Sequence, residues 1–321
     1  MDAMTQHELR NETLRATVDT RGAALISFKV HTADGWREIS VGGGLVKYAG
    51  STVGRFANRL ENGCFSLDGQ TFQTSANEPP NSLHGGADGF SERDWTLVAA
   101  TSSAVALRLT SADGDQGYPG QLEVAAVFDL GPHTLTVTYA ATTDKPTVIN
   151  LTLHPYFNLG VGATIDDHEL WLNAAEYTPT RDDGIPLGSI DPVAGTGMDF
   201  TTPRRIGDAR VAMLDAGLDR RGALDHGFMV PGEGVREMCR LSDGDLALTV
   251  LSDAPGVQIY DATWFDGAET MPDGRVVGPH SGLAIEPEDY VDAPNRPDWP
   301  SAELRPGETW SRTITFGVST T

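Results

Sequence analysis

Residues 122–140 read LEVAAVFDLGPHTLTVTYA, two runs separated by a short segment that contains glycine and proline. In both runs apolar side chains alternate with polar or small ones, which is the pattern of a β-strand with one buried face. Glycine and proline favour a turn between the runs. The stretch therefore predicts two strands joined by a turn.

The same alternation recurs along the chain, in residues 23–30, 95–100, 104–110, 246–252 and 309–318. The 36 glycines and 19 prolines fall at short intervals between such runs, as turns between strands require. Asp68-Gly69, Asp113-Gly114 and Pro306-Gly307 supply typical turn residues.

Helical periodicity is nearly absent. Residues 204–214, RRIGDARVAML, are the best candidate, and because the segment is short and holds a glycine we expect a turn or two of helix at most. Many strands without intervening helices indicate an all-β sandwich or closed barrel, not an α/β sheet.

The chain of 321 residues is 39% hydrophobic, enough to build a core. The sequence shows no internal repeat of about 40–50 residues, which argues against a propeller. The loop-rich region 178–225 is interpreted as an insertion over one face, so we expect a single domain spanning 1–321.

The charge balance is strongly acidic, with 45 Asp and Glu against 23 Lys and Arg. A net charge of −22 disfavours nucleic acid, anionic membranes and phosphorylated ligands, and favours a neutral partner. The segment MDAMTQHELRNETLR carries no apolar signal sequence and no long apolar window follows, so we expect a cytoplasmic protein without a membrane span. Cys64 and Cys239 form no CxxC pattern and are expected to be buried thiols.

The segment VINLTLHPYFNLG, residues 148–160, places a histidine in an apolar strand pattern. Alternation puts Asn150, Thr152 and His154 on the face opposite Leu151. Pro155 cannot donate to a sheet, so the strand is expected to end or bulge there, where functional side chains often lie. Taken alone, a structural or surface histidine is the simpler interpretation.

Three other segments hold chemically capable residues. His84 precedes two glycines in NSLHGG (81–86), which suits a tight turn or a close ligand equally well. Asp225 in LDHGF (224–228) is either a ligand contact or a loop cap. Glu286 ends an apolar run before Pro287, as His154 does before Pro155, and a carboxylate and an imidazole that converge would form a general base and acid. Taken alone, Glu286 is more simply interpreted as a surface carboxylate.

Metal and phosphate sites are not indicated. His84, His154 and His226 are far apart, with no second ligand three or four residues away, so we predict no metal site. The VGGG segment at 41–44 lacks the Lys-Ser/Thr of a phosphate loop and is predicted to be a turn.

An ordered set of segments resembles the aldose 1-epimerase (galactose mutarotase) family. The set comprises GRFANR (54–59), NEPPNSLHGG (77–86), DGDQGYPG (113–120), INLTLHPYFNLG (149–160), LDHGF (224–228), GVQIY (256–260), LAIEPED (283–289) and DAPNRPDWPSAELRPGETW (292–310). The resemblance implies a large antiparallel β-sandwich of the galactose mutarotase-like supersandwich type, with a sugar cleft on a concave face. It also implies interconversion of the α and β anomers of a free aldose without a cofactor.

The resemblance places the catalytic acid at His154 and the catalytic base at Glu286. It implies five substrate-binding residues: Asn58, Arg59, His84, Asp225 and Gln258. Opening a hemiacetal ring requires removal of the anomeric hydroxyl proton and protonation of the ring oxygen, so a base and an acid must flank one sugar.

Some residues depart from the common family pattern. Leu153 stands where a polar residue often precedes the histidine, Glu288 replaces a frequent glutamine, and Asp261 lies in the unusual run YDATW (260–264). Asp261 and Glu288 are expected to influence which hydroxyls are recognised, so the preferred sugar, whether galactose, glucose or a pentose, stays open.

Other functions compete with this interpretation. Mutarotation of a phosphorylated hexose would need a cluster of basic residues, and none is seen. A glycosidase would need two carboxylates, for which Asp225 and Glu286 are candidates. A carbohydrate-binding protein would keep the cleft without the chemistry. We expect a monomer or a homodimer.

Overall fold

The computed structural model describes residues 5–218 and 222–320. Its largest element is an antiparallel sheet of nine strands. In spatial order these strands are β11 (Thr96–Ala100), β12 (Ala104–Ser111), β13 (Leu122–Leu130), β14 (Thr134–Thr143), β30 (Trp310–Thr320), β24 (Leu246–Ser252), β23 (Arg236–Asp243), β18 (Glu169–Leu172) and β21 (Arg204–Arg205). The alternating runs read from the sequence are therefore confirmed as strands.

Two further sheets complete the sandwich. A seven-stranded sheet has the order β20 (Asp191–Pro192), β19 (Glu176–Thr178), β22 (Asp225–Met229), β25 (Gly256–Tyr260), β28 (Leu283–Glu288), β17 (Tyr156–Phe157) and β5 (Ser40–Val41). A four-stranded sheet consists of β1 (Gln6–Arg10), β2 (Leu14–Asp19), β3 (Ala24–Thr32) and β4 (Gly35–Glu38).

One hydrophobic core joins the three sheets. On β13 the residues Leu122, Val124, Ala126 and Phe128 are buried while their neighbours are partly or fully exposed, as the alternation predicts. Across the core, ring centroids of Phe157 on β17 and Phe316 on β30 lie 5.3 Å apart. Both large sheets have free ends in their strand order, so the molecule is a sandwich and not a closed barrel.

Short two-stranded ladders connect the sheets. They pair β7 (Arg59–Leu60) with β10 (Ser82–Leu83), β6 (Thr52–Val53) with β16 (Thr152–Leu153), β15 (Thr147–Val148) with β29 (Glu303–Leu304), β26 (Glu269–Thr270) with β27 (Val276–Val277), and β8 (Cys64–Leu67) with β9 (Gln70–Gln73). Asp68 and Gly69 join β8 to β9, both with positive φ, as a tight two-residue hairpin requires.

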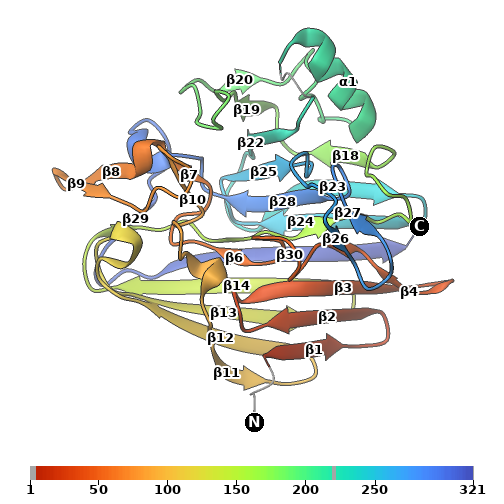
Figure 1. The fold of residues 1–321 in the computed structure, drawn as a ribbon, viewed down its shortest axis with the longest axis horizontal. Helices are drawn as coiled ribbons and strands as arrows, with labels where there is room; N and C mark the ends of the chain where they lie inside the picture. Colours follow the sequence, from red (N-terminus) through yellow and green to blue (C-terminus); the bar gives the residue numbers. More distant parts are fainter. Residues whose placement is uncertain (1–4, 219–221, 321) are drawn as a thin grey trace.

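The predicted short helix is longer than expected. α1 spans Ile206–Ala216, about three turns, and ends at Gly217 in the left-handed conformation. The internal Gly207 is explained by packing, because a Cβ there would lie 3.0 Å from the backbone oxygen of Asp166. In Figure 1, α1, β19 and β20 lie together at the top of the view. The interpretation of residues 178–225 as an insertion in a single domain stays a prediction. Four single-turn 3₁₀ segments are Glu61–Gly63, Phe90–Glu92, Asp115–Gly117 and Ala293–Asn295.

Two expectations about strand ends need correction. The chain around residues 148–154 is not one strand but two short pieces, β15 and β16, and after His154-Pro155 it enters a different sheet as β17. Glu286 does not end its strand, because β28 continues through Pro287 to Glu288. β17 pairs with β28 only at residues 283 and 284, so Pro287 lies where one edge of β28 needs no N–H donor.

Two minor features complete the fold. Cys239 is buried as predicted, but Cys64 is only partly buried, and neither forms a disulfide. None of the helices within the described ranges has the length and apolar character needed to cross a membrane.

Candidate active site

The strands β25 and β28 present a polar face on the side opposite the core. Val257 and Ile259 point into the core, and Gln258 between them points the other way. Glu286 lies directly opposite Gln258 in the strand register. Strict alternation thus places these two polar side chains next to each other at the floor of a cleft.

The cleft has a volume of about 980 Å³. The seven site residues proposed from the sequence all line it: Asn58, Arg59, His84, His154, Asp225, Gln258 and Glu286. Residues 180–184, Gly217 and Leu218 contribute one wall. Segments that are far apart in the sequence therefore meet around one cavity.

His154 and Glu286 are in direct contact. The His154 Nε2 atom lies 3.3 Å from Glu286 Oε1, and the residues are 4% and 2% exposed. The backbone of His154 is anchored on both sides, since its N–H donates to Ser51 and its carbonyl accepts from Gly50. The imidazole is thus held against the carboxyl group by the loop between β16 and β17.

Burial shifts both groups away from their charged forms. It lowers the pKa of His154 to about 4 and raises the pKa of Glu286 well above its usual range, with the negative charge of Glu288 adding to the latter effect. A lowered pKa makes imidazolium a stronger acid, and a raised pKa makes carboxylate a stronger base. The shifts therefore suit a proton donor and a proton acceptor that work together.

His84 is fixed by an unusual backbone. Asn58 and His84 have φ values of 63° and 51°, a conformation that non-glycine residues adopt rarely and often at functional sites. The Asn58 N–H donates to His84 Nδ1 at 3.1 Å, so neutral His84 carries its proton on Nε2. Burial lowers the pKa of His84 well below its usual value, so the ring serves as a neutral hydrogen-bond donor.

Gly85 explains the glycines after His84. A Cβ at Gly85 would lie only 1.9 Å from the backbone oxygen of Gly54, and its φ is 86°. The two backbone segments can approach this closely only because the side chain is a hydrogen atom. The sequence analysis left open whether the glycines of LHGG serve a tight turn or a close ligand. At Gly85 the close neighbour is another backbone segment, and this contact sets the position of His84.

Arg59 is held by carboxylates at the cleft wall. Its Nε and Nη2 atoms donate to the two carboxylate oxygens of Glu78 at 2.6 and 3.1 Å, and Nη1 lies 3.9 Å from Asp225 Oδ2. Asp225 in turn accepts a hydrogen bond from Gln258 Nε2 at 2.6 Å. The Gln258 Oε1 atom is buried without a partner among the described residues, as is Glu286 Oε2, so the cleft floor keeps unused hydrogen-bonding capacity.

Sequence patterns do not predict three tyrosines of the cleft. The Tyr48 ring lies 4.7 Å from that of His84, and the Tyr156 ring lies 5.0 Å from that of His154. Tyr156 also packs against Tyr260, at 5.9 Å. The position of Tyr156 two residues after His154 is an available signal, whereas nothing in the sequence around Tyr48 indicates its place.

The argument from sequence separation against a metal site is wrong. His84, His154 and Glu286 each place a ligand-type atom within 4.8 Å of the others. Metal coordination needs a deprotonated ring nitrogen, but His84 Nδ1 already accepts from Asn58 and its Nε2 carries the proton. The arrangement therefore suits a hydrogen-bond donor better than a metal ligand, and the absence of a metal stays a prediction.

Three of the residues that depart from the family pattern, Asp261, Leu153 and Glu288, do not line the cleft, although Trp264 of the same unusual run does. Asp261 is fully buried, with its Oδ2 atom 3.4 Å from Arg210 Nε and 3.3 Å from His280 Nδ1, and it holds α1 to the loop after β25. Leu153 lies in the core. Glu288 lies behind Asn58 and not in the lining. Direct hydroxyl recognition by Asp261 or Glu288 is therefore not supported.

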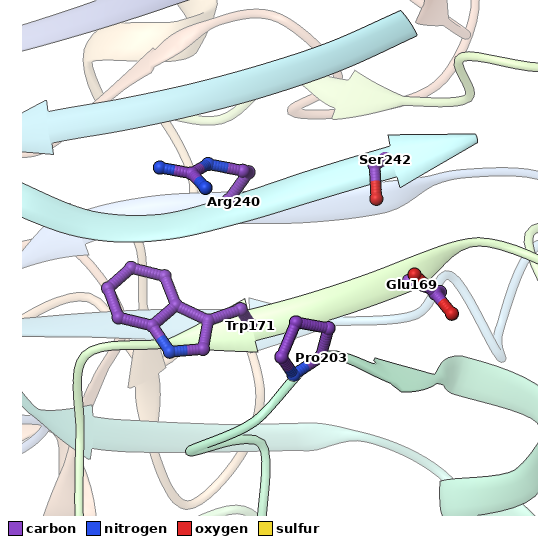
Figure 2. Close-up of a pocket in the computed structure, with 5 residues that line it drawn as sticks. All are labelled: Glu169, Trp171, Pro203, Arg240 and Ser242. Atoms are coloured by element: carbon purple, nitrogen blue, oxygen red, sulfur yellow. The ribbon is translucent and has the colours of Figure 1, made fainter. Parts of the chain in front are cut away.

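A second pocket lies away from these residues. It has a volume of about 280 Å³ and is formed by Trp171, Arg240, Glu169, Ser242 and Pro203, four of them on β18 and β23 (Figure 2). Among the described residues that line this second pocket, Glu169 is the one carboxylate and none is a histidine. This pocket lacks an acid and base pair, so the large cleft is the candidate active site.

A buried imidazole and carboxyl group lie at the floor of a polar cleft on an antiparallel β-sandwich, an arrangement that suits proton transfer. The family model described as aldose 1-epimerase matches residues 5–317. A protein from Homo sapiens named galactose mutarotase is 34% identical, covering 97% of this chain and 93% of its own. A protein from Escherichia coli (strain K12) named aldose 1-epimerase is 35% identical, covering 90% of this chain and 88% of its own.

Solved structures agree with this relationship. A GalM/aldose epimerase homologue from C. elegans superimposes with a TM-score of 0.88 at 26% identity, covering 98% of both chains. A galactose 1-epimerase from Lactobacillus acidophilus NCFM gives a TM-score of 0.84 at 28% identity, covering 98% of this chain and 94% of that one. The chain belongs to the aldose 1-epimerase family, and its sandwich is the galactose mutarotase-like fold.

Proposed function

We propose that this protein is a mutarotase, an isomerase that interconverts the α and β anomers of a free, neutral aldose such as galactose, glucose or a pentose. His154 is the general acid and Glu286 the general base. The observation that carries the proposal is the 3.3 Å contact between these two buried groups in the cleft. Curated relatives named galactose mutarotase and aldose 1-epimerase support the same activity.

The short distance suits the reaction. In a hemiacetal the anomeric hydroxyl and the ring oxygen are bonded to the same carbon, so one compact acid and base pair reaches both. Glu286 takes the proton of the anomeric hydroxyl while His154 protonates the ring oxygen, the bond from C1 to the ring oxygen breaks, and C1 becomes an aldehyde. Rotation about the C1–C2 bond and reclosure by the reverse transfers yield the other anomer.

The electrostatics favour ring opening. The opening step converts imidazolium and carboxylate into neutral imidazole and carboxylic acid. Burial stabilises these neutral forms, as the lowered pKa of His154 and the raised pKa of Glu286 express. Each positioned proton-transfer group typically contributes about 10²- to 10⁴-fold to the rate. The Nε2–H of His84 and the Arg59 guanidinium are assigned to binding the sugar oxygens.

The alternative functions fit the cleft less well. A glycosidase would need Asp225 as a second carboxyl group, but Asp225 accepts from Gln258 and lies near Arg59, an arrangement for binding rather than proton donation. A phosphorylated sugar would need an available cation, and within the described lining Arg59 and Arg181 both pair with carboxylates. The free aldose, the cytoplasmic location and the monomeric or homodimeric state remain part of this proposal.

Polarimetry on freshly dissolved α-anomers of several aldoses tests the activity. We expect equilibration well above the buffer rate for at least one sugar, and loss of about 10²-fold or more of the added rate in Glu286→Gln. Glu169→Gln, a carboxylate change in the second pocket, is the matched control and keeps the rate. A wild-type rate equal to buffer for every aldose, with calorimetric sugar binding, would instead establish a carbohydrate-binding protein. Release of nitrophenol from aryl glycosides would indicate the glycosidase.

A further inference from the structure

A second buried carboxyl group supports the proposed base. Glu288 follows Glu286 by two residues on β28, so both side chains leave the same face of the strand. Glu288 is 2% exposed and accepts a hydrogen bond from Asn58 Nδ2 at 2.8 Å. Glu288 itself does not line the cleft, but Asn58 and Glu286, which it adjoins, both do.

The nearby cations are committed to other partners. Arg59 makes its bidentate ion pair with Glu78, and Arg312 Nη2 donates to Asp289 at 2.9 Å. One oxygen of Glu286 and one of Glu288 are buried without a hydrogen-bond partner in the described part of the chain. Two adjacent buried carboxyl groups with few hydrogen bonds and, among the described residues, no uncommitted cation nearby cannot both ionise without a large free-energy cost.

We propose that Glu286 and Glu288 act as one buried carboxyl pair, in which Glu288 is a positioning residue that holds Asn58 at the cleft wall and whose negative charge, once it ionises, makes the transferable proton of the Glu286 and His154 pair harder to lose. The inference rests on the proposed function, because Glu286 is the base there. A glutamine in place of Glu288 would hold Asn58 equally well but would not supply the charge.

The surrounding groups support the pairing. Burial raises the pKa of Glu288 to about 8, the Asn58 hydrogen bond opposes this shift, the Asp289 and Asp225 charges add to it, and Arg312 opposes it. The pKa of Glu286 is raised by burial first, then by the charges of Glu288 and Asp225, and is lowered by Arg59.

The pair therefore affects the alkaline side of the reaction. The imidazole and carboxyl group of the acid and base pair must hold one transferable proton between them, and activity ends when that proton is lost. As pH rises through the titration of Glu288, its new negative charge makes the proton harder to remove from Glu286. The protein thus keeps the active protonation state to higher pH.

Glu288→Gln is the decisive variant. It keeps an acceptor for Asn58 and removes the charge, so we expect activity at neutral pH within about tenfold of wild type and KM nearly unchanged. The alkaline limb of the profile of kcat/KM against pH should shift to lower pH by about half a unit or more. At pH values above the limb, this shift lowers kcat/KM about threefold relative to wild type. The acid limb should not move. An alkaline limb at the wild-type position would overturn the inference.

Two further measurements separate the possible failures. Asp261→Asn removes a buried carboxylate that touches neither the cleft nor Glu286, and we expect it to leave the alkaline limb in place. Infrared titration of the wild-type protein needs neither a substrate nor a variant: we expect a protonated-carboxyl band that persists above about pH 6, loses part of its intensity near the Glu288 titration and disappears only at higher pH, when Glu286 ionises. Loss of all such signal below the Glu288 titration would overturn the pairing even if the enzyme is active. A persistent band in a protein without mutarotase activity would overturn only the function.

Discussion

Burial acts on His154 and Glu286 in opposite chemical directions. It makes the imidazole give up its proton and makes the carboxyl group keep one. In water the two groups would form imidazolium and carboxylate between about pH 4.5 and 6.5, but in this cleft the neutral forms are favoured. We infer that the cleft stabilises the protonation states of His154 and Glu286 that follow ring opening more than those that precede it. Such a preference accelerates the opening step.

The acid limb of the pH profile follows from the buried His154. Below its pKa of about 4 the acid and base pair takes up a second proton, and Glu286 can no longer act as a base. We therefore expect kcat/KM to stay level from neutral pH down to about 5 and to fall as pH approaches 4. Stopped-flow polarimetry in buffers of constant ionic strength measures this. An acid limb near the ordinary histidine value of about 6.5 would contradict it.

At the residue scale, motifs locate the cleft but not its electrostatics. Short patterns such as LHGG and LAIEPED point to the seven site residues, and the fold brings them to one cavity. Patterns cannot show that His154 touches Glu286, since 132 positions separate them. They also cannot place Tyr48, whose role depends on a loop conformation and not on a local motif.

At the element scale, alternation predicts the long strands well and the short ones poorly. Residues 122–130 pair along their whole length with residues 135–143, where the two faces differ in burial. In residues 147–153 both faces are buried, so alternation carries no information about where pairing stops. Pro287 resembles a strand end in the sequence because the sequence does not reveal which edge of β28 lacks a neighbour.

The loop that carries His84 gives a prediction at the same scale. Gly85 and Gly69 have similar positive φ values of 86° and 77°, but only at Gly85 would an added Cβ meet other atoms within 4 Å. Gly69→Ala should therefore cost only the left-handed strain, about 1–2 kcal/mol. Gly85→Ala should cost more in urea unfolding and should raise KM, because the Gly54 backbone cannot yield without moving His84.

The two glycine variants control for each other. Equal losses of unfolding free energy, with KM unchanged in Gly85→Ala, would contradict the assigned role of the close backbone approach. A larger loss confined to Gly85→Ala, accompanied by a higher KM, would connect the geometry of the loop to sugar binding.

At the scale of the whole molecule, the sandwich separates stability from chemistry. The core lies between the sheets, and the cleft lies on the other face of the seven-stranded sheet, where Gln258 and Glu286 form its floor. The cleft therefore adds buried ionisable groups, among them His154 and Glu286, to a largely apolar structure. Their desolvation opposes folding, and the apolar core must offset it.

The pH dependence of global stability tests this cost. The pKa of Glu288 is about 8 in the folded protein against an ordinary value of 4.5, so between these values the unfolded chain releases a proton that the folded protein keeps. The contribution of Glu288 to the unfolding free energy is therefore fully present below about pH 4.5 and is lost as pH rises toward about 8. Glu288→Gln cannot ionise, so its stability relative to wild type should increase across this window, as urea unfolding at several pH values would measure. Glu233→Gln removes an exposed carboxylate and should track wild type at every pH. A stability difference between Glu288→Gln and wild type that stays constant from about pH 5 to 8 would show that Glu288 is ionised in the folded protein throughout.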